Sequence, residues 1–115
     1  MLLIAVDDLL FSSKIRTAAK HAGAEIVFAR TPAEILQQAR ALRPSAVIFD
    51  LNSERVDPID TIRALKADAG LAGIAAIGFV SHVRADIIDA AREAGADEVM
   101  ARSAFVTRLG EILRS

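Results

Sequence analysis

The chain has 115 residues, 53% of them apolar, and a formal net charge of −1 at pH 7. This length and composition predict one domain, spanning residues 1–115, which buries its own core and needs no disulfide or metal to fold. Lysines and arginines stand singly among acidic residues, so no direct nucleic-acid partner is expected, and a chain with two histidines and no cysteine is a poor candidate for a zinc site.

From the amino terminus onward, apolar runs alternate with amphipathic helical patterns. The first run, LLIAV at residues 2–6, stops at two aspartates, which argues against a signal peptide or membrane span and favours a cytoplasmic protein without membrane contact. A helical pattern follows at residues 10–22 and should end at Gly23. The second run, EIVFA, precedes T-P-A-E, where Thr31 is expected to cap a helix, Pro32 to occupy its first position and Glu34 to complete a capping box.

The second half of the chain repeats this alternation. SAVIF at residues 45–49 precedes a helix for which Asp57 is the expected cap and Pro58 the first residue. IAAIGFV and DEVMA are the last two runs, and a helical pattern follows each, the final one with Ser103 as its expected cap. Apolar runs joined by single helices, without a two-residue hairpin signal, predict an α/β fold with a parallel sheet covered on both faces.

Acidic side chains directly follow two of the predicted strands. Asp7 and Asp8 end the first run and Asp50 ends the third, while Ser81 and Arg102 follow the fourth and fifth. Sites of parallel sheets lie beyond the carboxyl ends of the strands. If the first and third strands are neighbours, the carboxylates converge, repel one another and require a divalent cation or a nearby lysine or arginine. The less specific interpretation is that Asp8 caps a helix and Asp50 lies in a strand-end turn.

This order of motifs resembles the receiver domain of two-component response regulators over the whole chain. The resemblance rests on the acidic pair, the lone Asp50, the hydroxyl of Ser81 and A-G-A-D before the fifth strand. It implies a flavodoxin-like, doubly wound sheet of five parallel strands in the order 2-1-3-4-5. It also implies that Asp50 is the phosphoacceptor, that Ser81 contacts the phosphoryl group, and that Asp7, Asp8, Asp50 and the backbone carbonyl of Asn52 hold Mg²⁺, a cation that takes oxygen ligands.

Partners follow from the same resemblance. Asp50 would receive its phosphoryl group from a histidine kinase or a phosphotransfer protein, and the face formed by the fourth helix, fifth strand and fifth helix would meet an unknown downstream protein. That region carries both signs of charge, at Arg84, Asp86, Asp89, Arg92, Arg108, Glu111 and Arg114, which on physical grounds alone indicates a solvated face. We expect a stand-alone signalling module rather than an enzyme.

The chain departs from the receiver pattern at several positions. Receivers usually end the fifth strand with lysine and then proline, whereas this chain has Arg102 and Ser103, and a planar guanidinium is not equivalent to an ammonium group. Arg102 could reach the phosphoryl oxygens, pair with Asp50 in the unmodified protein, or stand exposed near a helix start. Val99 replaces the usual aromatic of the fifth strand, so an aromatic switch cannot operate there. Pro58 replaces a usual glycine and stiffens the start of the third helix.

These departures and one further motif leave two alternatives open. The chain could be a degenerate pseudo-receiver that docks on a partner without phosphorylation, with Arg102 neutralising the acids in place of metal. Separately, VIFDLN resembles the opening D-x-D motif of haloacid-dehalogenase phosphatases. Asn52 replaces the second aspartate of that motif, and the lysine and further acids of the family are missing, so a phosphatase is the remote alternative.

Overall fold

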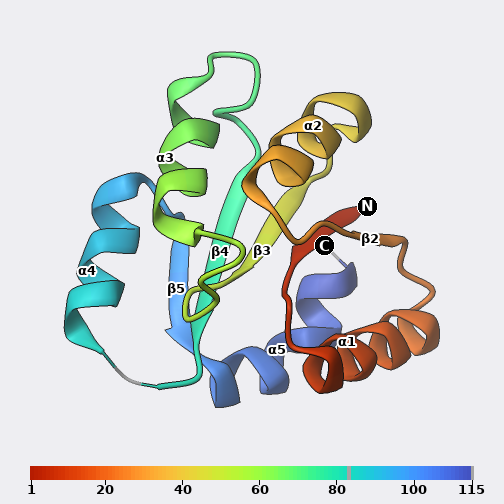
Figure 1. Cartoon of the computed structure of the whole chain (residues 1–115). Helices are drawn as coiled ribbons and strands as arrows, with labels where there is room; N and C mark the ends of the chain where they lie inside the picture. The colour runs from red at the N-terminus through yellow and green to blue at the C-terminus, as the bar shows by residue number, and fades with distance from the viewer. Residues whose placement is uncertain (83, 115) are drawn as a thin grey trace.

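The structure, a computed structural model, describes residues 1–82 and 84–114. Its strands are β1 (Leu2–Ala5), β2 (Ile26–Phe28), β3 (Ala46–Asp50), β4 (Ala75–Val80) and β5 (Glu98–Ala101). Its helices are α1 (Leu9–Ala22), α2 (Pro32–Leu42), α3 (Pro58–Ala67), α4 (Ala85–Ala94) and α5 (Arg102–Arg114). The strands pair in parallel in the order β2-β1-β3-β4-β5 (Figure 1), which confirms the predicted flavodoxin-like sheet and its strand order.

Helices cover both faces of the sheet. Helices α2, α3 and α4 lie on one face, and α1 and α5 lie on the other (Figure 1). Because successive side chains of a strand point to opposite faces, each strand contributes to two cores. In β1, Leu3 and Ala5 pack under α2, α3 and α4, whereas Leu2 and Ile4 pack under α1 and α5. Burial on both faces explains why the inner strands β1, β3 and β4 are almost entirely apolar.

Local signals at the ends of α1 match the sequence pattern. The Asp8 side chain accepts a hydrogen bond from the backbone N–H of Phe11 at 3.0 Å, so Asp8 caps the helix in addition to standing at the site edge. Gly23 closes α1 with φ 65°, a left-handed conformation that glycine adopts without the steric cost of a Cβ. None of the described helices is long and apolar enough to cross a membrane.

The start of α2 is predicted correctly except for one hydrogen bond. Pro32 is the first helical residue, and Thr31 Oγ1 accepts a hydrogen bond from the Glu34 backbone N–H at 3.2 Å. The Glu34 carboxylate accepts a hydrogen bond from the backbone N–H of Arg30 at 3.0 Å. In a capping box this bond would come from Thr31, so the reciprocal contact is displaced by one residue.

One predicted cap is confirmed in position only, and another is wrong. Asp57 is the N-cap residue of α3 and Pro58 begins the helix, as expected, but Asp57 has φ 46° and its side chain makes no capping hydrogen bond. α5 begins at Arg102, directly after β5, so Ser103 lies inside the first turn instead of capping it. The carbonyl of Ser103 accepts a hydrogen bond from the Thr107 hydroxyl, as a helical residue can.

Candidate functional site

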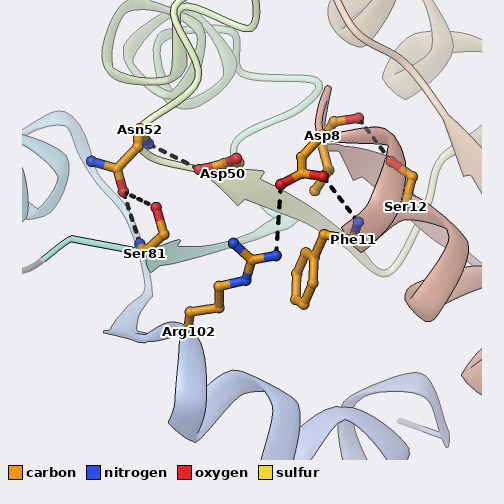
Figure 2. Close-up of polar contacts among 8 residues, drawn as sticks. Asp8, Phe11, Ser12, Asp50, Asn52, Ser81 and Arg102 are labelled. Carbon is orange, nitrogen blue, oxygen red and sulfur yellow. Dashed lines mark hydrogen bonds and ion pairs between the residues drawn. The ribbon is translucent and has the colours of Figure 1, made fainter.

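The carboxyl ends of β1, β3 and β4 lie together at one edge of the sheet. β3 pairs in parallel with β1 on one side and with β4 on the other, so the residues that follow these strands share that edge. This pairing places Asp7 and Asp8 on one side of Asp50 and Ser81 on the other. The prediction that the first and third strand ends are neighbours is therefore confirmed. Figure 2 shows Asp8, Asp50 and Ser81 at the ends of these adjacent strands.

Asp50 ends β3 and is partly buried. Its carboxylate accepts a hydrogen bond from the backbone N–H of Asn52 at 3.0 Å. Burial raises the pKa of Asp50 above its ordinary value, and the negative charges of Asp8 and Asp7 act in the same direction. The Asn52 hydrogen bond and the positive charge of Arg102 oppose this rise without cancelling it. The ionised carboxylate is therefore in an environment that an additional cation would stabilise.

Asn52 connects Asp50 to Ser81. Its side-chain Oδ1 accepts hydrogen bonds from the backbone N–H of Ser81 at 2.8 Å and from the Ser81 hydroxyl at 3.1 Å (Figure 2). The Ser81 hydroxyl is thus turned toward Asn52, and it must rotate about its side-chain bond before it can donate to a group bound at Asp50. This side-chain role of Asn52 is not predicted, since the resemblance to receivers implies a role only for its backbone carbonyl.

Arg102 extends from the first residue of α5 toward Asp8. Its Nη2 lies 3.7 Å from Asp8 Oδ2, and its guanidinium carbon lies 3.9 Å from the centre of the Phe11 ring (Figure 2). The guanidinium is partly exposed, and its ion pair is with Asp8 instead of Asp50. Contact of Arg102 with phosphoryl oxygens stays a prediction. Stacking on Phe11 holds the side chain over the acidic edge, which is the part of the sheet edge formed by Asp7, Asp8 and Asp50.

Asp7 has an arginine partner of its own, which is not predicted from the sequence. Arg55, in the loop between β3 and α3, places Nη1 at 3.2 Å from Asp7 Oδ1. The only signal in the sequence was that Arg55 is the one basic residue in that loop, after the acid of β3. Each member of the acidic pair is therefore neutralised by an arginine from a different segment.

The donor atoms at this edge fit Mg²⁺ by their chemistry but are engaged elsewhere. Carboxylates and a backbone carbonyl are the oxygen ligands that Mg²⁺ takes. Within residues 1–82 and 84–114, however, no three histidine or acidic side chains are arranged to hold a metal ion. Asp7 and Asp8 pair with Arg55 and Arg102 instead. Each of these ion pairs engages one oxygen of its carboxylate, Asp7 Oδ1 and Asp8 Oδ2.

Comparison with known proteins gives matches at the level of structure. No protein-family model matches the chain, and no curated protein matches it in sequence. A protein described as a response regulator of Chloroflexus aurantiacus superposes with a TM-score of 0.83 and 24% identity, covering 99% of this chain and 97% of that one. The signal receiver domain of a DNA-binding response regulator of Colwellia psychrerythraea superposes with a TM-score of 0.83 and 20% identity. The superposition covers 98% of this chain and 94% of that one.

A third similar structure contains a metal. The Mn²⁺-bound form of the response regulator Rcp1 superposes with a TM-score of 0.79 and 16% identity, covering 98% of this chain and 88% of that one. The chain therefore has the fold of response regulator receiver domains along almost its entire length. At these identities the likeness concerns the fold, and the function must be argued from the site itself.

Proposed function

We propose that this chain is a receiver domain that accepts a phosphoryl group on Asp50 and relays the signal by binding another protein. The observation that supports this function best is the position of Asp50. It ends the central strand of a receiver-like sheet, between the acids that follow β1 and the hydroxyl that follows β4. A carboxylate with a raised pKa at such an edge is a candidate nucleophile.

In the proposed reaction, a carboxylate oxygen of Asp50 attacks the phosphorus of the donor. The bond between phosphorus and the donor's leaving group breaks, and an acyl phosphate forms on Asp50. Asp7, Asp8, Asp50 and the Asn52 carbonyl would hold Mg²⁺, whose positive charge would offset the approach of an anionic donor. The Ser81 hydroxyl, once rotated away from Asn52, and the Arg102 guanidinium would donate hydrogen bonds to the phosphoryl oxygens.

The proposed donor is a histidine kinase or a phosphotransfer protein. Leu9 and Leu10, directly after the acidic pair, are 77% and 87% exposed, and these apolar side chains beside the site suit contact with a protein donor. The proposed output surface is the face of α4, β5 and α5, where Arg84 pairs with Asp86 and Arg108 with Glu98. A cytoplasmic location belongs to the same proposal.

Intact mass spectrometry tests the phosphoacceptor. The purified chain is incubated with Mg²⁺ and a small phosphodonor, and we expect the mass to increase by one phosphoryl group. The increase should be lost in Asp50→Asn and retained in Asp89→Asn, which removes one exposed carboxylate from α4. A mass increase that persists in Asp50→Asn would place the modification elsewhere and reject Asp50 as the acceptor.

A phosphorylation-independent docking module is the second candidate. It is favoured by the ion pairs of Arg55 with Asp7 and Arg102 with Asp8, which neutralise the acids without metal. Failure of the chain to gain mass with any phosphodonor would support this candidate. Neither candidate is a turnover enzyme, and release of phosphate from a generic aryl phosphate would instead favour the phosphatase alternative.

A further inference from the structure

The two arginines at the acidic edge differ in how firmly they are held. Arg102 stacks on the buried Phe11, and 36% of its side chain is exposed. The Arg55 side chain is 60% exposed, and among the described residues the contact found for its guanidinium is the one with Asp7. Arg102 is therefore positioned by the core, whereas Arg55 is positioned by a single carboxylate.

Arg55 can leave Asp7 without disturbing the fold. Arg55 lies in the loop between β3 and α3. Two buried residues anchor this loop, Leu51 at its start and Val56 directly after Arg55. The backbone N–H of Leu51 donates to the Phe79 carbonyl at 3.0 Å, which fixes the start of the loop to β4. The side chain of Arg55 contributes to none of these anchors, so its departure exposes no apolar surface.

We propose that Arg55 is an internal counter-ion that competes with a divalent cation for Asp7. This inference rests on the proposed function, because it concerns the same metal site. Arg55 occupies one carboxylate oxygen of Asp7, and its positive charge repels a cation that approaches the same carboxylate, so the guanidinium and the cation oppose each other there. Arg55 thus weakens metal binding, and its release moves a positive charge from the acidic edge into solvent.

Equilibrium binding of Mn²⁺, followed by the paramagnetic resonance signal of the free ion, tests this proposal. We expect Arg55→Gln to bind Mn²⁺ roughly three- to tenfold more tightly than the unsubstituted chain, the range that loss of one exposed ion pair and one nearby charge permits. The difference should shrink at high salt, because exposed charges are screened. Asp7→Asn should weaken binding in either background.

Arg40→Gln is a matched control. Arg40 pairs with Asp68 at 3.5 Å, and these side chains are 58% and 37% exposed, against 60% and 35% for Arg55 and Asp7. That pair joins α2 to the carboxyl end of α3, away from the acidic edge. The control changes the net charge equally, so its Mn²⁺ affinity should match that of the unsubstituted chain.

Two results would overturn the inference. One is that Arg55→Gln gains no Mn²⁺ affinity over the unsubstituted chain, whether both proteins bind Mn²⁺ equally or neither binds it. The other is an equal gain in Arg40→Gln, which would reduce the effect to net charge. Phosphorylation of the same samples, read by mass, separates this inference from the proposed function. Equal affinities with a phosphorylated Asp50 reject only the role of Arg55, whereas tighter binding without phosphorylation rejects only the function.

Discussion

At the scale of single residues, Asp50 links the site to the stability of the fold. Its pKa is raised from the ordinary value of 3.8, first by burial and then by Asp8 and Asp7. The folded state therefore favours the neutral carboxyl. The contribution of this group to the free energy of unfolding is largest below about pH 3.8 and is lost as the pH rises through the raised pKa.

We predict that Asp50→Asn is more stable than the unsubstituted chain at pH 7. The amide carries no charge, and its oxygen can still accept the hydrogen bond from the Asn52 N–H. The gain should be on the order of 1 kcal/mol or less, because the carboxyl is only partly buried and water screens it. Urea unfolding from pH 3 to pH 8 measures the effect, which should vanish at the acidic end. A gain that is independent of pH would contradict the assignment to charge.

At the scale of elements, β4 touches the loop that follows β3 at Gly78. A Cβ at this position would lie 2.8 Å from Leu51 Cδ1 and 2.9 Å from its Cγ. Leu51 is 4% exposed, so the added Cβ would press on a side chain of the core. The close approach of these two residues sets the start of the loop that carries Asn52 and Arg55.

We predict that Gly78→Ala lowers the free energy of unfolding by about 1–3 kcal/mol, as overpacking of a full core does. The displaced Leu51 should also shift the NMR amide signal of Asn52, the next residue in the chain. Gly73→Ala is the control, because nothing lies within 4 Å of the added Cβ there. Equal urea midpoints for the two variants would show that the contact with Leu51 is relieved without cost.

At the scale of the whole molecule, two cores share one sheet. Ile35 of α2 is fully buried in one core, and Ile15 of α1 is fully buried in the other. Both layers of helices pack on the same sheet, so the stability of each layer depends on that sheet. The two faces should consequently unfold together.

We predict that Ile35→Val and Ile15→Val each lower the free energy of unfolding by about 0.5–1.5 kcal/mol, the usual cost of one buried methylene. In each variant, far-UV circular dichroism and the NMR signals of both cores should follow one urea transition. Separate midpoints for the two faces would indicate that one layer of helices melts alone, contrary to this prediction.

Most of the fold was predictable because its signals are local or periodic. The inner strands are apolar on both faces, and Thr31 with Pro32 begins α2 through contacts within four residues. The missing side-chain hydrogen bond of Asp57 and the wrong cap at Ser103 have a different origin. Asp57 takes a left-handed conformation in a loop that packs against the sheet, and β5 runs into α5 without a separate capping residue. Both depend on tertiary contacts that residue type alone does not reveal.

An α/β sheet with Asp7, Asp8, Asp50, Ser81 and Arg102 after its strands is predictable from residue order alone, because apolar periodicity and strand ends are local features of the chain. Which charges meet depends on how the chain folds. Arg55 reaches Asp7 across 48 positions of the chain, and Arg102 reaches Asp8 by stacking on Phe11. Charged pairs that are this far apart in the sequence produce no periodic pattern, because their geometry depends on how the loops and helices pack around the sheet.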